Sequence, residues 1–453
     1  MPWYEILPAA MLICMALFIF TGFPVALVLG GLGLTFGLIG IAVGEFRLVH
    51  FNAVPLRIYA GSVENIILVA IPMFIFMGTM LEKSGIAEDL LYTLQILTRR
   101  LPGGLAISVT LLGTILAATT GIIGASVVLL TLMALPEMLR RGYDAKLATG
   151  TIASSGTLGI LIPPSIMLVL MADQLSVPVG VLFTGALFPG LLLAALYVGY
   201  IMAVAVLRPD RAPAMERDVG PKGVELAAMV VRTFIPPVFL IVLVLGSIFA
   251  GWATPTEASG IGAVGATLLA VFKRRLSYPV LKEVVQRAAV TNAMIFGIFV
   301  GATCFSLVFK RLGGDYLIEE VINSLGVGPW GTLAMIMLVV FFLGFFLDWI
   351  EITLIVLPIF APVVAALDFG AHLGEAAMVL PWFAVLMAVN LQTSFLTPPF
   401  GFALFYMKGA ASYVNIRDIY LGIIPFVLLQ VLGLALCMLF PEIVTWLPDA
   451  VLN

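Results

Sequence analysis

Long apolar runs separated by short polar stretches recur along almost the whole chain. A helix needs about 20 predominantly apolar residues to cross the hydrocarbon core of a bilayer. Residues 7–22 and 24–43 meet this requirement, and residues 65–81 follow after a mildly polar loop. Further uninterrupted crossings are predicted at residues 179–206, 230–250, 256–272, 289–309 and 419–440. The pattern is typical of an all-α polytopic membrane protein surrounded by lipid.

Two apolar runs are interrupted by small and polar residues. Residues 103–138 are broken at Thr119-Thr120-Gly121-Ile122-Ile123-Gly124-Ala125-Ser126, and residues 329–366 at Leu347-Asp348-Trp349-Ile350-Glu351-Ile352-Thr353. Irregular backbone at membrane depth is tolerated only where it is buried in protein or lines a wet cavity. We interpret each run as a re-entrant hairpin with the break at its tip. A single long kinked helix is the alternative for the first run.

Paired prolines interrupt one further helix in each half of the chain. Residues 145–176 contain Pro163-Pro164, preceded by Gly156 and Gly159, and residues 376–408 contain Pro398-Pro399. Proline lacks a backbone N–H and disfavours helix in the preceding residue, so each pair predicts a helix broken at bilayer depth. One such break is as well explained by a simple kink. Matched breaks in two halves of a membrane chain point to a transporter's binding site.

The order crossing, amphipathic helix, hairpin, Pro-Pro helix and crossing occurs twice. Residues 86–100 and 313–325 are the amphipathic helices, which are too polar to span and suit the membrane interface. The predicted division is N-terminal scaffold helices at 1–64, a first repeat at 65–206, a polar cytoplasmic linker at 207–228, scaffold helices at 229–282 and a second repeat at 283–453.

The distribution of Lys and Arg residues predicts how these elements are oriented in the membrane. With both hairpins returning to their own side, only Arg47, Arg57, Lys310 and Arg311 of the 22 Lys and Arg residues lie on one face, and the rest lie on the other. Cytoplasmic loops are enriched in these residues, so the richer face is predicted to be cytoplasmic and both termini to lie outside. The first repeat then enters the membrane from outside and the second from inside. The repeats are therefore inverted, as alternating access requires.

Composition narrows the functional classes. Of the 453 residues, 62% are hydrophobic and 10% charged, and no polar stretch is long enough for a soluble domain. The three cysteines lie in apolar surroundings, and the two histidines are far apart, so a disulfide framework or zinc site is not expected. The chain lacks the G-x-x-x-x-G-K-[ST] motif, so ATP hydrolysis is not expected, nor are a cofactor or a nucleic-acid partner. Residues 260–265 match G-x-G-x-x-G but lie in an apolar helix, where small residues favour close packing.

The four breaks are predicted to meet near the middle of the membrane, where each frees main-chain groups from helical bonding. Carbonyls and hydroxyls at the C-terminal end of a half-helix suit a hard cation such as Na+, and amides at an N-terminal end suit a carboxylate. A hydroxyl that bonds back to its own helix or joins two helices is the alternative for any single residue. The candidate ion- and substrate-binding residues are Thr119, Thr120, Gly121, Gly124, Ser126, Ser154, Ser155, Gly156, Thr157, Pro163, Pro164, Asp348, Glu351, Thr353, Asn390, Thr393, Ser394, Thr397, Pro398 and Pro399.

Asp348 and Glu351 are acidic residues in an apolar setting, which marks them as functional candidates in a membrane protein. We expect them to bind Na+ or to relay protons, and a tip exposed to a water-filled vestibule is the alternative. Glu257 has a structural explanation, because Thr254-Pro255-Thr256-Glu257 fits a helix-capping box.

Three motifs resemble the large membrane subunit of TRAP (tripartite ATP-independent periplasmic) transporters, the DctM-like proteins. They are residues 156–165 (GTLGILIPPS), 254–258 (TPTEA) and 396–401 (LTPPFG), and the resemblance extends along nearly the whole chain. It implies an elevator-type ion transporter fold, in which the hairpins and broken helices move against a scaffold. It also implies Na+-coupled import of a small organic anion, a carboxylate, across the bacterial inner membrane, with periplasmic termini. The implied partners are a small four-helix membrane subunit and a periplasmic solute-binding protein.

The resemblance also implies two sodium sites. One lies between the tip at residues 119–126 and residues 155–157, and the other between the tip at residues 348–353 and residues 393–397. Ser155, Thr157, Asp348 and Thr397 are the expected Na+ ligands. The first tip is more apolar here than in many relatives, which are richer in Ser and Gly at this point.

Other functional classes fit parts of the pattern. A stand-alone ion-coupled carboxylate transporter or antiporter has the same broad architecture but needs no binding protein. An intramembrane enzyme requires a nucleophile and base or a metal dyad at depth, and the sequence offers only Asp348 and Glu351, so the chain is not expected to be an enzyme. A channel requires a continuous pore, against which inverted broken repeats argue.

Overall fold

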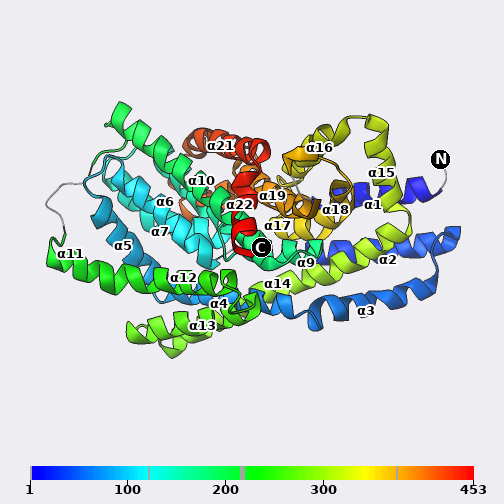
Figure 1. The fold of residues 1–453 in the computed structure, drawn as a ribbon, viewed down its shortest axis with the longest axis horizontal. Helices are drawn as coiled ribbons and strands as arrows, with labels where there is room; N and C mark the ends of the chain where they lie inside the picture. Colours follow the sequence, from blue (N-terminus) through cyan, green and yellow to red (C-terminus); the bar gives the residue numbers. More distant parts are fainter. Residues whose placement is uncertain (1–2, 121–122, 215–219, 374–375, 453) are drawn as a thin grey trace.

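The computed structural model describes residues 3–120, 123–214, 220–373 and 376–452. Every regular element in these ranges is helical (Figure 1), and nine of the helices described are long and apolar enough to cross a membrane. The all-α polytopic fold predicted from the sequence is confirmed.

The helices outside the two predicted repeats include α13 (Pro255–Phe272), at whose start the sequence predicts a capping box. The others are α1 (Trp3–Ile19), α2 (Val25–Val43), α3 (Ala53–Ile58), α11 (Val224–Met229) and α12 (Ile235–Phe249). At the start of α13, Thr254 Oγ1 accepts from Glu257 N at 3.3 Å and Thr254 N donates to Glu257 Oε2 at 2.8 Å. Pro255 occupies the first helical position, where no backbone N–H is needed. The predicted capping box is confirmed.

The same succession of elements occurs in both halves of the chain. The first half has α4 (Ala70–Lys83), α5 (Ile86–Thr98), α6 (Gly104–Thr120), α7 (Ile123–Arg140), α8 (Ala145–Thr157), α9 (Ile166–Leu175) and α10 (Val179–Leu207). The second has α14 (Tyr278–Arg311), α15 (Gly314–Leu325), α16 (Gly328–Leu343), α17 (Trp349–Glu351), α18 (Leu357–Ala365), α19 (Val379–Leu396), α20 (Phe402–Ala410), α21 (Ile416–Leu439) and the additional C-terminal α22 (Glu442–Leu452). A π-helical segment, Ile352–Val356, joins α17 to α18.

Helices α6 and α7 lie side by side (Figure 1), and both also pack against α8. This is the arrangement of a hairpin, and the two ends of one long kinked helix would diverge instead. In the second half, α16 contacts the π-helical segment that follows α17.

The two helices that lead into the proline pairs are almost entirely buried. Each residue of α8 from Leu147 to Thr157 is buried, and 94% of the spanning segment of α19 is buried, against 22–56% for the other candidate spans. Helix α8 packs closely on α21, where a Cβ added to Gly150 would collide with the carbonyl of Gly422. Small residues allow this backbone-to-backbone approach between membrane helices.

Several element boundaries differ from those predicted. Helical turns occupy Leu48–Asn52, Ala53–Ile58 and Tyr59–Val63, where a loop is expected, and α3 packs on α14. Helix α14 begins at Tyr278, capped by Ser277, instead of at residue 289, and the helix after the linker begins at Val224. The hydropathy of the sequence predicts only the part of a helix that crosses the hydrocarbon core. Helices continue beyond that core, where exposing a polar residue to water has no free-energy cost.

Helix α5 is more enclosed than an interfacial helix. Ile86, Leu90 and Leu94 are buried as the amphipathic pattern predicts, but Thr93 and Gln95 are buried as well. The reason is tertiary packing: α6 covers one side of α5, and the π-helical turn that leads into α12 covers another.

Candidate functional site

The first proline pair lies in a break inside the protein. Residues 158–165 separate α8 from α9, and this interval contains the cis Pro163–Pro164 bond. Ser165 Oγ donates to Ile160 O at 2.6 Å and caps α9 by accepting from Leu168 N. All residues of the break are buried, so the protein encloses the irregular backbone, as membrane depth requires.

The second proline pair lies closer to the surface. Residues 397–401 separate α19 from α20 and contain the cis Pro398–Pro399 bond. Pro399 and Phe400 are exposed, and Tyr420 Oη donates to Pro399 O at 3.1 Å. Both helices are broken, as the prolines predict, but only the first break is fully enclosed.

The tip of the first hairpin contacts the second broken helix. Thr119 and Thr120 end α6, but their side chains, and the whole of Gly121, lie outside the described residues. Gly124 and Ser126 lie in the first turns of α7, and Ser126 is buried. A Cβ on Gly124 would lie 3.0 Å from the ring of Tyr406 in α20, so tip and broken helix meet directly.

The tip of the second hairpin contacts the same broken helix. Gly344, which follows α16, lies so close to Ser394 that an added Cβ would collide with its hydroxyl. The rings of Phe346 and Phe400 lie 5.2 Å apart. Within the tip, Asp348 is the N-cap of the short helix α17, and its Oδ1 accepts from Trp349 N at 2.8 Å.

The four breaks belong to one connected group of helices. Helix α20 packs on α7 and α8, α19 packs on α8 and α9, and the π-helical segment of the second hairpin packs on α9. Gly156 at the end of α8 lies against Val127 of α7, where a Cβ would meet the Val127 backbone at 3.1 Å. Each broken helix therefore lies beside a hairpin, and the two broken helices lie beside each other.

Most candidate hydroxyls bond to their own helices. Ser154, Thr157, Thr393, Ser394 and Thr397 each donate to a carbonyl three or four residues earlier, at 2.6 to 3.0 Å. This is the helix-internal role that Ser and Thr commonly adopt. A hydroxyl that donates one bond still has lone pairs that can accept another or bind a cation.

Ser155 and Asn390 instead connect different helices. Ser155 Oγ donates to Thr110 Oγ1 on α6 at 3.3 Å, and a Cβ on Gly113 would lie 2.7 Å from the Ser155 Cβ. Asn390 Nδ2 donates to Met337 O on α16 at 2.7 Å. Thr110 is thus a buried hydroxyl beside a candidate ligand. No sequence motif points to Thr110, because it lies in the hairpin arm outside any break.

Some buried side-chain polar atoms of the described chain lack hydrogen-bond partners, on the second tip and α19 as well as at Thr131, Thr151, Asn292 and Gln430. Within the described chain, Glu351 Oε2, Thr353 Oγ1 and both amide atoms of Gln392 are buried and make no hydrogen bond. Thr353 and Gln392 are 0% exposed and Glu351 is 6% exposed. A buried group left in this way costs about 1–3 kcal/mol, so a ligand, ion or water that bonded to any of these atoms would be stabilised.

Gln392 is missing from the residues chosen by sequence. One sequence feature could have identified Gln392. Its amide lies inside an apolar helix, between Leu391 and Thr393, where it caps no helix and belongs to no break. In the described chain no group of three or more His, Cys, Asp or Glu side chains could hold a metal ion. A cation at this site would therefore rely on hydroxyl, amide and main-chain oxygens with Asp348 or Glu351.

Helix α14 lines two polar pockets, each with one arginine. A pocket of about 410 Å³ lies between α4, Ala125 beside the first tip, and Gln286, Arg287 and Thr291 of α14. In it Arg287 pairs with Glu82 at 3.3 Å. A pocket of about 190 Å³ is lined by Arg57, Gln174, Thr303, Ser306 and Leu354. A guanidinium matches a carboxylate well, yet neither arginine lies near a sequence motif.

Comparisons with known proteins identify the family. The family described as "Tripartite ATP-independent periplasmic transporter, DctM component" matches residues 12–443. The C4-dicarboxylate TRAP transporter large permease protein DctM of Pseudomonas aeruginosa is 30% identical over 388 residues, which cover 85% of this chain and 87% of that protein. The ectoine TRAP transporter large permease protein TeaC of Halomonas elongata is 27% identical over 385 residues, covering 84% and 86%.

A solved structure shares the fold. The YdaH transporter of Alcanivorax borkumensis, described as having an unusual topology, superposes with a TM-score of 0.63 over 88% of this chain and 89% of that chain, at 12% identity. At this identity the likeness concerns the fold alone, whereas the sequence relatives are named as transport proteins and not as enzymes. The chain therefore belongs to the DctM family, the large permease component of tripartite ATP-independent periplasmic transporters.

Proposed function

We propose that this chain is the transport subunit of a Na+-coupled importer of a small carboxylate, which a periplasmic binding protein delivers. One observation carries the proposal: two interrupted helices, each beside a hairpin, pack against each other, and in the described chain the second hairpin and α19 hold buried side-chain oxygens without hydrogen-bond partners. Half-helix ends bind anions at their amides and cations at their carbonyls. Cargo and coupling ion thereby share one site.

Two sodium sites follow from the pairing of hairpins and broken helices. The first uses Ser155 and Thr157 with the first tip, and the second uses Asp348 and Thr397 with the second tip. The contacts of α7 with Gly156 and of Gly344 with Ser394 support this pairing. The unpartnered oxygens of Glu351 and Thr353 supply further acceptors beside the second tip.

An elevator mechanism is the proposed conformational change. The two hairpins and two broken helices form the moving unit, and α14 with the helices packed along it, α2 and α4, forms the stationary surface. The polar pockets on α14 support this division, because each lies between α14 and an element of the moving unit. Arg57, which forms no ion pair within the described residues, would attract a carboxylate into the smaller pocket.

The proposed setting is the bacterial inner membrane, with both termini in the periplasm. The proposed partners are a small membrane subunit and a periplasmic binding protein, because the family name describes a tripartite assembly. Cargo differs among relatives, with C4-dicarboxylate in one name and ectoine in another. Identification of the cargo therefore begins with the ligand of the binding protein encoded with this chain.

The test is uptake of that ligand by proteoliposomes containing this chain and its small subunit. Uptake is expected only with the loaded binding protein outside and an inward Na+ gradient. Uptake that proceeds at the same rate without the binding protein would favour a stand-alone transporter. Uptake that is unaffected when choline replaces Na+ would contradict sodium coupling.

A further inference from the structure

A pocket of about 530 Å³ opens where α5 and the loop after α13 approach the π-helical turn Val230–Phe234 and the start of α12, and it contains no residue of the four breaks. Its lining combines three basic side chains, Arg232, Lys273 and Arg275, with one acid, Asp89. Leu269 and Phe272 of α13 complete it with apolar surface. Neither the transport mechanism nor the sequence motifs use these residues.

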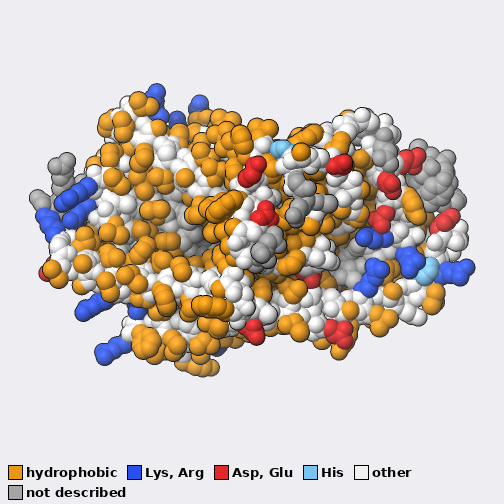
Figure 2. Space-filling model, in the orientation of Figure 1, with side chains coloured by type: hydrophobic (Ala, Val, Ile, Leu, Met, Phe, Trp, Pro, Cys, Tyr) orange, Lys and Arg blue, Asp and Glu red, His pale blue; other side chains and the backbone are white. Residues whose placement is uncertain are grey.

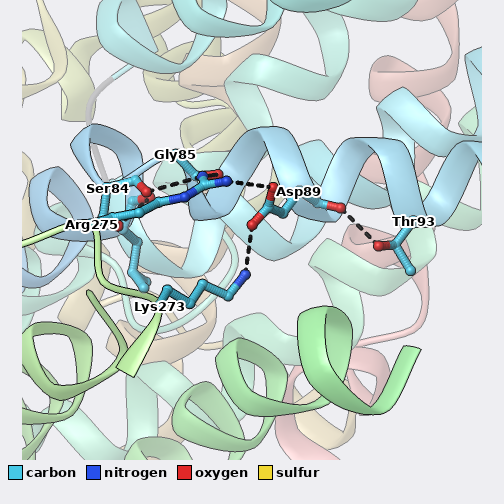
Figure 3. Close-up of polar contacts among 7 residues, drawn as sticks. Ser84, Gly85, Asp89, Thr93, Lys273 and Arg275 are labelled. Atoms are coloured by element: carbon cyan, nitrogen blue, oxygen red, sulfur yellow. Dashed lines mark hydrogen bonds and ion pairs between the residues drawn. The ribbon is translucent and has the colours of Figure 1, made fainter. Parts of the chain in front are cut away.

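Asp89 organises two of the three cations (Figure 3). Lys273 Nζ lies 2.8 Å from Asp89 Oδ2, and Arg275 Nη2 lies 3.1 Å from Asp89 Oδ1. Arg275 Nη1 also donates to the carbonyls of Ser84 at 3.2 Å and Gly85 at 2.7 Å. These contacts attach the corner between α4 and α5 to the loop between α13 and α14 and hold the basic groups in place.

Positive charge remains in excess in the pocket. One carboxylate faces three cations, and Arg232 makes no ion pair with any residue of the described chain. An ammonium has three N–H donors and a guanidinium five, so both Lys273 and Arg275 keep donors beyond those used by Asp89. The pocket is therefore built to accept an anion with several oxygen acceptors.

The surface beside the pocket is apolar. Phe272 is 78% exposed and Phe239 is 60% exposed, and Ile235, Leu268 and Val271 are exposed with them on α12 and α13. In Figure 2, hydrophobic side chains cover the surface over α12 and α13, and Lys and Arg side chains gather at the left edge of the same region. A ligand that fits both surfaces has an anionic head and a long apolar body.

We propose that this pocket binds the phosphate of an anionic phospholipid, whose acyl chains lie along α12 and α13. Basic pockets between transmembrane helices on the cytoplasmic side suit anionic lipid headgroups, and Arg232 and Arg275 can each bind phosphate oxygens through two N–H groups. A free phosphate ion shares this headgroup chemistry but would leave the exposed Phe272 and Phe239 without a partner. Bound lipid would bridge Arg232 to the corner that Asp89 and Arg275 hold together.

The test is native mass spectrometry of the purified full-length chain in detergent with phosphatidylglycerol, phosphatidylcholine or glycerol 3-phosphate. Phosphatidylglycerol is expected to remain bound in preference to phosphatidylcholine. Arg232→Gln and Arg275→Gln are each expected to weaken its binding about fivefold, the effect of one basic residue near an anionic headgroup. Arg274→Gln is the matched control, because Arg274 is exposed and adjacent in sequence but does not line the pocket.

Circular dichroism and gel filtration show whether each variant folds. Arg275 also holds the corner between α4 and α5, whereas Arg232 makes no ion pair in the described chain, so Arg232→Gln keeps the test independent of folding. Equal retention of the two lipids, or the same loss in Arg274→Gln as in Arg232→Gln, would overturn the proposal. If glycerol 3-phosphate displaced bound phosphatidylglycerol as effectively as added phosphatidylglycerol does, the pocket would be assigned to a free phosphate. That result would overturn the proposal of a lipid ligand.

Discussion

Glu351, Thr353 and Gln392 bring polar atoms into the protein without giving them hydrogen-bond partners in the described chain. Structural polar residues at membrane depth normally find partners, since each unsatisfied group is costly. Asn390, on the same helix as Gln392, illustrates the structural case, because its amide bonds to Met337 O. The contrast between these two amides separates a residue that holds helices together from one that is available to a ligand.

Asp348→Asn tests the proposed cation site at the second tip. Asn caps a helix about as well as Asp, so the bond from Trp349 N to residue 348 and the fold are expected to survive. Loss of the charge is expected to raise the Na+ concentration for half-maximal uptake at least about tenfold, equivalent to about 1.4 kcal/mol. Asp368→Asn is the control, because Asp368 Oδ1 caps a turn in the same way, accepting from Gly370 N at 2.8 Å. Unchanged sodium dependence in Asp348→Asn would remove this residue from the site.

Gln392→Leu tests whether the unpartnered amide serves a ligand. Replacing a buried polar group that makes no hydrogen bond with an apolar one of similar size relieves a cost of about 1–3 kcal/mol. The melting temperature is therefore expected to stay the same or rise, while uptake falls at least about tenfold. Retained uptake with a raised melting temperature would mean that Gln392 makes no contact with cargo or ion.

Sequence reasoning at the residue scale succeeds for chemistry that is local. Thr254 and Glu257 form the predicted capping box because its partners are three residues apart. Sequence reasoning fails for Thr110, Gln392 and Arg287, because their surroundings are formed by helices that are far apart in sequence. It also cannot tell that Thr157 and Thr397 bond to their own helices, since a hydroxyl's partner depends on its rotamer.

At the scale of elements, the close crossing of α8 and α21 positions the first broken helix. A Cβ on Gly150 would collide with the Gly422 carbonyl, so Gly150→Ala is expected to destabilise the protein by about 1–3 kcal/mol through overpacking. Gly199→Ala on α10 is the control, because nothing lies within 4 Å of its added Cβ. The control is expected to be neutral or stabilising by up to about 1 kcal/mol. Equal melting temperatures for both variants, measured in detergent, would contradict this packing.

The breaks are the elements that the sequence predicts best. Proline restricts its own backbone and that of the preceding residue, so Pro163-Pro164 and Pro398-Pro399 interrupt their helices regardless of their neighbours. The enclosure of α5 and the exposure of Phe400 are not predictable in this way. The enclosure of α5 and the exposure of Phe400 depend on which other helices pack against them. The pattern of apolar residues along the chain does not contain this information.

At the scale of the whole molecule, transport by the proposed mechanism requires the moving unit to slide along α14. Ala125, beside the first tip, and Thr291, on α14, line the same pocket. A bifunctional crosslink between cysteines at these two positions, in a chain without its native cysteines, is expected to abolish uptake. A crosslink between Thr79→Cys and Thr291→Cys is the control, because both residues line this pocket but belong to the stationary helices α4 and α14. Full uptake with Ala125 and Thr291 crosslinked would contradict the elevator.

The most direct test of the central claim, that the four breaks build one sodium-coupled cargo site, is the initial rate of cargo uptake into proteoliposomes as the Na+ gradient is varied. The account predicts that uptake by the wild-type chain follows the inward Na+ gradient and stops when the gradient is abolished. It predicts that Asp348→Asn needs at least about tenfold more Na+ for half-maximal uptake and that Asp368→Asn behaves as the wild-type chain. Uptake that is the same with and without the gradient in the wild-type chain would contradict the claim.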